Sequence, residues 1–227
     1  DGRYLATCSL DSAIILWDVK DPEHQPPLGE VLVKRFSGVR AVASREDGEL
    51  IASAGDGGSI ELWNRRTRLN GERTAARAAH RAPVTSLAFA PTAAGGPFGL
   101  LASGAEDGTL VLWDTGDPDA AGFTKLADLG DLSVEEVARS IAGKEGEHPM
   151  GVTGLAFSAD RKILAVSFGH ATDRRRDGEV RFWDVGDPRA PRKLHVLPGV
   201  QGQGAVWGLD LRRDGRALAY AANDGNI

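Results

Sequence analysis

A run of three arginines is one place where this chain could bind a ligand. Arg174, Arg175 and Arg176 lie between Asp173 and Asp177. A guanidinium group can donate two parallel hydrogen bonds to one carboxylate or phosphate. The run is therefore a candidate for binding an acidic peptide or a phosphate. The plainer interpretation is a solvated loop, because the neighbouring aspartates already offset part of its charge.

Residue patterns for catalysis or metal binding are missing from the sequence. There is no Gly-x-Ser-x-Gly motif to supply a hydrolase nucleophile. Gly143-Lys144 resembles the end of a phosphate-binding loop, but the earlier glycine is missing and Glu145 follows the lysine. The histidines at 24, 80, 148, 170 and 195 show no metal-binding spacing with one another or with Cys8. We therefore predict no catalytic residues, no metal site and no cofactor.

The composition is that of a globular protein. The 227 residues include 27 Lys and Arg against 32 Asp and Glu, and the net charge of −5 argues against a dedicated nucleic-acid-binding protein. Cys8 is the single cysteine, so an internal disulfide is impossible and a reducing, cytoplasmic location is expected. No apolar run approaches the ~20 residues of a membrane helix. The chain opens at Asp1 without a leader, so we expect a soluble domain cut from a longer protein.

The elements that must position any site come from an internal repeat. Three stretches align without gaps: Tyr4–Asp18, Leu50–Asn64 and Leu100–Asp114. A fourth, Ile163–Asp184, matches with seven extra residues in its middle, and a fifth, Ala217–Ile227, matches until the sequence stops. These five stretches predict five equivalent structural units.

Each unit is expected to contain a tight hairpin with a further strand on either side. Asp-Gly or a related pair separates two apolar runs, which is a strong hairpin signal because glycine tolerates positive φ. Inner strands are predicted ahead of four hairpins, at Val39–Ser44, Val84–Ala90, Val152–Ser158 and Val206–Leu211. Outer strands are predicted after four of them, at Glu30–Lys34, Glu72–Ala78, Phe123–Leu129 and Lys193–Leu197. The period therefore holds four strands.

Tryptophan ends four of the hairpins. Trp17, Trp63, Trp113 and Trp183 are 46, 50 and 70 residues apart. Four-stranded units of about 40–45 residues are the period of a β-propeller blade. The longer spacings require insertions.

The Leu-Trp-Asp and Phe-Trp-Asp endings, the Asp-Gly turns and the upstream His80 and His148 resemble WD-repeat (WD40) β-propellers. The resemblance covers essentially the whole chain. It implies an all-β propeller of four-stranded blades, with about four and a half blades in an incomplete ring. We treat residues 1–227 as a single propeller segment with units ending near 18, 64, 114 and 184 and a fifth truncated at 227. The Asp-Pro linkers after the tryptophans resemble bacterial WD-repeat proteins, in which the propeller is part of a multidomain signalling protein.

The resemblance also implies a buried network that links His, Ser or Thr, Asp and Trp in each blade. The matching positions are Ser9, Asp11 and Trp17 in unit one, Trp63 in unit two, His80, Asp107 and Trp113 in unit three, His148, Asp177 and Trp183 in unit four, and Asp224 in unit five. Ala105 is expected to replace the hydroxyl of unit three, and Gly57 stands at the Asp position of unit two.

Two insertions account for the longest spacing. The first spans Asp128–Glu147, where Ser133 and Glu136 form a capping box. Apolar residues recur there at helical spacing and predict a short helix over 134–142. The second, Gly169–Asp177, carries the three arginines into the hairpin turn of unit four.

The resemblance places both insertions at one rim of the propeller, the usual partner-binding face of the family. That rim displays the residue before each turn aspartate, and Trp207 begins an inner strand beside it. The candidate partner-binding residues are Arg174, Arg175, Arg176, Glu106, Trp207 and Asn223. Core packing is the plainer interpretation of Trp207.

We predict a non-catalytic scaffold or sensor that presents rim loops to a protein or peptide partner, as part of a larger signalling protein. One alternative is an enzyme that uses the central channel, where the inner strands offer only Thr85, Ser86, Thr153 and Asp210. Another is phosphate or nucleic-acid binding through Arg174–Arg176, which the net charge of −5 disfavours.

Overall fold

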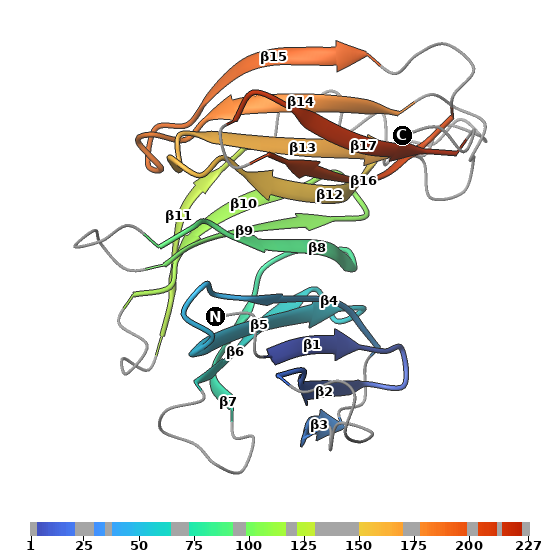
Figure 1. The fold of residues 1–227 in the computed structure, drawn as a ribbon, viewed down its shortest axis with the longest axis vertical. Coiled ribbons are helices and arrows are strands. Elements are labelled where there is room, and N and C mark those ends of the chain that lie inside the picture. The colour runs from blue at the N-terminus through green and yellow to red at the C-terminus, as the bar shows by residue number, and fades with distance from the viewer. Residues whose placement is uncertain are drawn as a thin grey trace.

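Each repeated sequence unit folds into its own antiparallel sheet (Figure 1). The computed structural model describes residues 4–20, 30–34, 38–64, 73–92, 99–116, 122–129, 150–169, 178–198, 204–212 and 215–223. These residues contain seventeen strands. The helix expected over 134–142 lies outside the described residues.

We number the five sheets as blades in chain order. Blade one has three strands, namely β1 (Tyr4–Cys8), β2 (Ala13–Asp18) and β3 (Glu30–Lys34). Blade two has β4 (Val39–Ser44), β5 (Leu50–Gly55), β6 (Ser59–Asn64) and β7 (Arg73–Ala78). Blade three has β8 (Val84–Phe89), β9 (Leu100–Ala105), β10 (Leu110–Asp114) and β11 (Thr124–Asp128).

Blade four has β12 (Gly151–Phe157), β13 (Ile163–Gly169), β14 (Glu179–Asp184) and β15 (Arg192–Pro198). Blade five has two described strands, β16 (Val206–Leu211) and β17 (Leu218–Ala222). All pairings follow sequence order, and the inner strands β4, β8, β12 and β16 are neighbours in space. The predicted strands are confirmed to within two residues at each end.

In blades one, two and three, one residue of the described hairpin turn takes a left-handed backbone conformation. Gly58 and Gly108 have φ angles of 67° and 81° at this position, and Ser12 takes it in blade one with φ 72°. In blades one and three the preceding aspartate holds the turn, because Asp11 Oδ1 and Asp107 Oδ1 each accept a backbone N–H two residues later, at 3.0 Å. The turn chemistry therefore sets the register of each hairpin.

The inner strands share a bulge near their first residue. The register shifts directly after Val39, Val84, Val152 and Val206. The extra residues at these bulges are Arg40, Thr85, Thr153 and Trp207. A bulge turns its extra residue out of the regular pleat, so these four equivalent positions differ in direction from their neighbours.

The hydrophobic core lies between consecutive sheets. Trp63 packs with Ile14 and Leu16 of blade one, and Trp113 lies in a cluster with blade two. Trp183 belongs to the cluster formed with blade three. Each of these tryptophans is 3% exposed, so successive blades bury equivalent side chains against the blade before.

The sheets follow one another along an open arc, from blade one at the bottom of Figure 1 to blades four and five at the top. This confirms the prediction of an all-β propeller with an incomplete ring. Among the residues that the structure describes, none forms a helix long and apolar enough to cross a membrane.

Candidate functional site

A chain of hydrogen bonds runs through blade three from its core to its hairpin turn. The indole Nε1 of Trp113 donates to Ser103 Oγ at 2.8 Å, and Ser103 Oγ lies 2.7 Å from His80 Nε2. The other ring nitrogen, Nδ1 of His80, lies 2.6 Å from Thr109 Oγ1. Thr109 in turn donates to Asp107 Oδ1 at 2.6 Å. His80 and Asp107 are therefore linked through a threonine hydroxyl.

The donors along this chain are consistent with a neutral His80. Because Ser103 accepts from Trp113, its own proton can go to His80 Nε2, and Nδ1–H can then donate to Thr109. Burial lowers the pKa of His80 below its ordinary value, and the carboxylates of Asp107 and Asp128 oppose this shift without cancelling it. The network is thus a structural element that joins the turn to the core.

Two expectations about this network were wrong. Blade three does have the hydroxyl, because Ser103 supplies it in place of Ala105. In blade one, Trp17 Nε1 donates to Thr7 Oγ1 at 2.8 Å and not to Ser9. The reason is the pleat of the strand. Leu5 pairs with Trp17 and Leu101 pairs with Trp113, and the residue two positions after each leucine lies on the same face of the sheet as the tryptophan. These residues are Thr7 and Ser103.

Ser9 lies beyond the end of β1, where its Oγ accepts a local bond from the Asp11 amide. Trp63 follows the same rule and donates to Ser53 Oγ at 2.9 Å. In blade four the same position on β13 is Val166, since Leu164 pairs with Trp183. His148, Asp177 and Asp224 lie outside the described residues.

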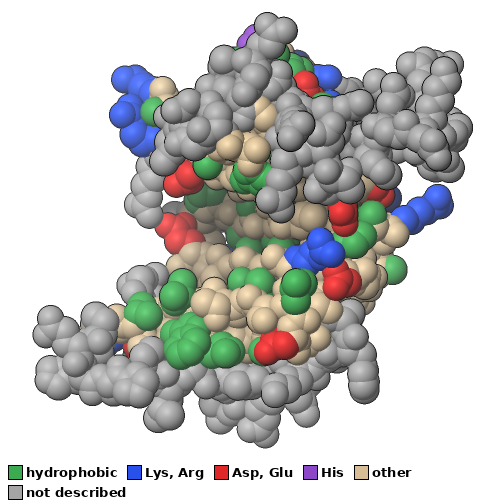
Figure 2. All heavy atoms as spheres, turned by 90° about the vertical axis from the view of Figure 1, so that its right-hand side faces the viewer, with side chains coloured by type: hydrophobic (Ala, Val, Ile, Leu, Met, Phe, Trp, Pro, Cys, Tyr) green, Lys and Arg blue, Asp and Glu red, His purple; other side chains and the backbone are tan. Residues whose placement is uncertain are grey.

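The candidate rim residues occupy equivalent backbone positions. The amides of Asp56, Glu106 and Asn223 each donate to the carbonyl directly before an inner strand, at 3.0, 2.9 and 3.1 Å. The turn between β1 and β2 lies on the right-hand side of Figure 1, and Figure 2 faces that side. We call this face the turn rim.

An ion-paired cluster joins blades two and three on the turn rim. Arg40 Nε bonds to Asp56 Oδ1 at 2.5 Å, and Arg40 Nη1 lies 3.8 Å from Glu106 Oε2. All three side chains are more than a third exposed. The predicted rim residue Glu106 is therefore positioned beside a cation from the neighbouring blade.

The turn rim extends to blade one at Gly38, which lies between Asp56 and Leu10. A Cβ at Gly38 would lie 2.7 Å from Asp56 Oδ2 and 3.1 Å from Leu10 Cδ2. The side chain of Leu10 is 68% exposed. Side chains of three successive blades thus form one surface, and Figure 2 shows hydrophobic and charged groups of both signs on this face.

Trp207 stands at the bulge of β16, the position that Arg40 holds in β4. It is 40% exposed, so it is only partly used in packing. The corresponding threonines make hydrogen bonds instead: Thr85 donates to the Val152 carbonyl of blade four, and Thr153 bonds to Ser167 within its own sheet. Arg174, Arg175 and Arg176 lie outside the described residues.

The sequence-based site list omitted Arg40 and Asp56. The signal that identifies Asp56 is its alignment with Glu106, one residue before the turn position taken by Gly57. Arg40 follows Val39 as Trp207 follows Val206, so aligning the inner strands would have identified it.

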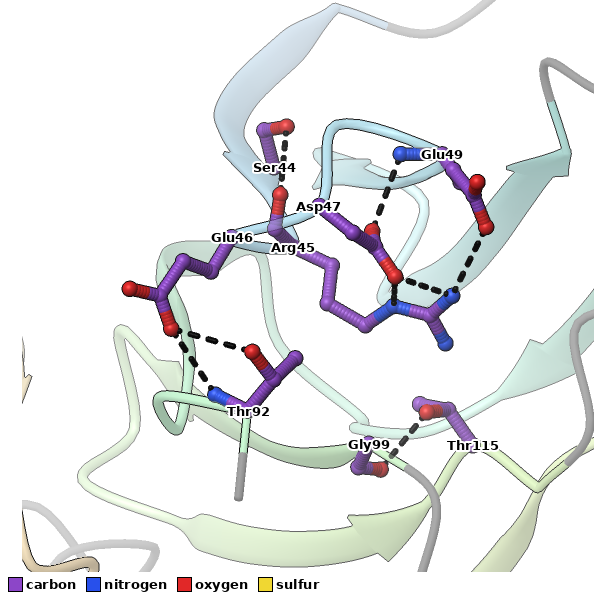
Figure 3. A network of polar contacts seen from close by, with 8 residues as sticks. All are labelled: Ser44, Arg45, Glu46, Asp47, Glu49, Thr92, Gly99 and Thr115. Carbon is purple, nitrogen blue, oxygen red and sulfur yellow. Dashed lines mark hydrogen bonds and ion pairs between the residues drawn. The ribbon is translucent and has the colours of Figure 1, made fainter. Parts of the chain in front are cut away.

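The opposite end of the strands carries a second polar network, shown in Figure 3. Arg45 is 5% exposed and bonds to Asp47 Oδ2 through Nε at 2.8 Å and Nη2 at 2.7 Å. Glu46 Oε2 accepts bonds from the Thr92 amide and hydroxyl, at 3.0 and 3.1 Å. The Glu46–Thr92 contacts join blades two and three, and the Arg45–Asp47 ion pair lies within the turn between β4 and β5, so we treat the network as structural.

Twisted antiparallel sheets that pack face to face, with their inner strands adjacent, define a β-propeller. The sequence matches the WD40 family (WD domain, G-beta repeat) over residues 1–18, 31–64, 71–114 and 143–184. The chain belongs to this family, whose members are generally non-catalytic scaffolds that bind proteins.

Two fungal relatives illustrate the range of the family. The chain is 28% identical over 165 residues to a probable cytosolic iron-sulfur protein assembly protein 1 of Cryptococcus neoformans, covering 65% of this chain and 35% of that protein. It is 29% identical over 160 residues to protein transport protein SEC13 of Mycosarcoma maydis, covering 68% and 40%. The chain thus spans well under half the length of either relative.

Solved structures show the same fold. The Cps50 (Swd1) β-propeller domain of Myceliophteria thermophila superposes with a TM-score of 0.66 at 17% identity, covering 98% of this chain and 60% of that one. A chain of the Mitotic Checkpoint Complex superposes with a TM-score of 0.69 at 21% identity, covering 98% and 59%.

Proposed function

We propose that this chain is a non-catalytic interaction module that binds a protein or peptide partner on its turn rim. The observation that carries the proposal is the continuous surface formed by Leu10, Arg40, Asp56 and Glu106 from three successive blades. Trp207 at the equivalent bulge of blade five extends the set of exposed side chains. Aromatic and arginine side chains are the types that most often dominate binding energy at interfaces.

The mechanism is rigid display. Buried sheets fix the bulges and turns, so the partner loses little free energy to ordering this surface when it binds. Arg174, Arg175 and Arg176, together with the insertion before β12, supply specificity in this proposal. The ion pairs of Arg40 orient its guanidinium group and favour a partner with mixed charge.

The wider context is also part of the proposal. The chain acts within a larger regulatory or signalling protein of the cytoplasm. The two relatives are named for cytosolic assembly and for transport, which supports a scaffold role. Both are fungal, so they give no support to the bacterial context expected from the Asp-Pro linkers.

The test uses affinity capture of partners from a cell lysate, followed by calorimetric titration of a recovered partner. Trp207→Ala and the triple change of Arg174, Arg175 and Arg176 to Ala should each weaken binding about tenfold or more, because such anchors often contribute 2 kcal/mol or more. The melting temperature should change little.

Leu194→Ala is the matched control. Leu194 is 52% exposed on the outer strand β15, away from the turn rim, and its loss should not change the affinity. Equal affinities for wild type and both rim variants would contradict the proposal. Nucleic-acid binding with a steep dependence on salt concentration would replace it by the phosphate-binding alternative.

A further inference from the structure

A cavity lies between blades three and four, at the end of the strands opposite the turn rim. Its volume is about 270 Å³. It is bordered by the first residue of β9, the last residue of β10 and the turns that follow β12 and β14. Leu100, Leu126 and Pro188 give it an apolar part large enough for one aliphatic side chain.

Two arginines line this cavity from different turns. Arg161 lies in the β12–β13 turn and Arg189 in the β14–β15 turn. Neither guanidinium group has a hydrogen bond or an ion pair with any residue that the structure describes. Arg161 is half-buried and Arg189 is exposed, so both guanidinium groups can reach an occupant of the cavity.

Among the three blades in which this turn is described, blade four alone has a residue other than glycine at its left-handed position. Arg161 has a φ angle of 63°, whereas Gly48 and Gly215 hold the equivalent turn position in blades two and five with φ 71° and 68°. The three turns close with the same amide-to-carbonyl bond, of 2.9 Å in blade four and 2.8 Å in the other two. Residues other than glycine seldom adopt this left-handed backbone conformation. Glycine would therefore suit the fold better than arginine here, and strain of this kind collects at functional positions.

Two carboxylates also line the cavity and restrict what can bind. Asp114 Oδ1 accepts the Gly116 amide at 2.9 Å, and Asp187 Oδ1 accepts the Arg189 amide at 3.0 Å. Both are thus used in holding their own turns. Their charges balance the two arginines, so the cavity disfavours a polyanion and suits a single carboxylate beside an apolar group.

We propose that this cavity docks a short segment of a partner protein that carries an aliphatic residue close to an aspartate or glutamate. The aliphatic side chain packs against Leu100, Leu126 and Pro188. The carboxylate accepts charge-assisted hydrogen bonds from Arg161 and Arg189. The site is separate from the turn rim, and it does not depend on the function proposed for that rim.

The experiment is a titration of the full chain with acetylated, amidated hexapeptides. Each peptide carries one leucine and one glutamate at separations of one to four positions, and each has a partner in which glutamine replaces the glutamate. We expect at least one glutamate peptide to bind at millimolar concentration or below. Its glutamine partner should bind about tenfold more weakly or worse.

Arg161→Gly is the decisive variant, because it restores the residue of the sibling turns. It should raise the melting temperature and yet lower the affinity for the glutamate peptide about tenfold or more. Arg189→Ala should lower the affinity without raising the melting temperature. Arg81→Ala removes one exposed arginine away from the cavity and should change neither.

Three results would overturn the proposal. These are binding of no peptide at millimolar concentration, equal binding of the glutamate and glutamine members, or unchanged affinity in Arg161→Gly. Trp207→Ala should leave peptide binding intact, so a failure of the turn-rim proposal and a failure of this one can be told apart.

Discussion

At the scale of single residues, Ser103 is the centre of the best-defined network. Its hydroxyl accepts from the Trp113 indole and contacts His80 Nε2. Ser103→Ala leaves Trp113 Nε1 and His80 Nε2 without this hydrogen-bond partner, and each unsatisfied polar group costs about 1–3 kcal/mol. We expect the free energy of unfolding to fall by about 3 kcal/mol, measured by chemical denaturation.

The matched control is Ser59→Ala on β6. No hydrogen bond of the Ser59 hydroxyl occurs within the described residues, so its loss should change stability by less than about 0.5 kcal/mol. Equal losses in the two variants would show that the Ser103 network contributes nothing beyond side-chain size.

His80 gives the fold a dependence on pH. Burial lowers its pKa in the folded chain, so the unfolded chain binds the proton more readily. The stability linked to His80 is complete above the unfolded pKa of about 6.5 and is lost as the pH falls from there to the folded pKa. The free energy of unfolding should therefore decrease between about pH 7.5 and pH 5.5.

The comparison with His80→Gln isolates this effect, because glutamine keeps hydrogen-bonding groups and does not titrate. The variant should show a shallower slope of unfolding free energy against pH over that range. If the two slopes were the same, the pH dependence would arise from other groups.

At the scale of elements, the hairpin turns depend on glycine where the sheets approach one another. Gly58 has a φ angle of 67°, and a Cβ there would lie 2.4 Å from the His80 carbonyl oxygen. Gly58→Ala combines left-handed strain with a backbone clash. We expect a loss of about 2–4 kcal/mol in thermal or denaturant unfolding.

Gly122→Ala is the control for this change. Among the described residues, and apart from its own neighbours in the chain, no heavy atom lies within 4 Å of the added Cβ, and alanine restricts the unfolded chain. Its stability should stay within about 1 kcal/mol of wild type. A large loss at Gly122 together with none at Gly58 would contradict this account of the turns.

At the scale of the whole molecule, the arc separates the two proposed binding faces. The turn rim gathers residues from blades one, two, three and five, and the cavity between blades three and four lies at the other end of the strands. Effects of rim and cavity substitutions on binding should therefore be independent, as expected for distant sites.

The repeat, the hairpins and the propeller class follow from the sequence alone. The period of the tryptophans and the alternation of turn and apolar residues can be recognised in the sequence, because each hairpin forms from residues that are close together in the chain. The turn aspartates Asp11 and Asp107 bond two residues along the chain, so their role can be read without knowing what packs against them.

The tertiary structure decided which residues meet across blades. The sequence comparison assigned the hydroxyl of unit one to Ser9 and expected none in unit three, but the pleat places the hydroxyls of Thr7 and Ser103 within hydrogen-bonding distance of the tryptophans. Arg40 reaches Glu106 only because blades two and three pack in a fixed order, and Arg161 and Arg189 of blade four line one cavity with residues of blade three for the same reason. Contacts of this kind depend on register and on the packing of sheets, and a one-residue change of register moves every side chain to the other face.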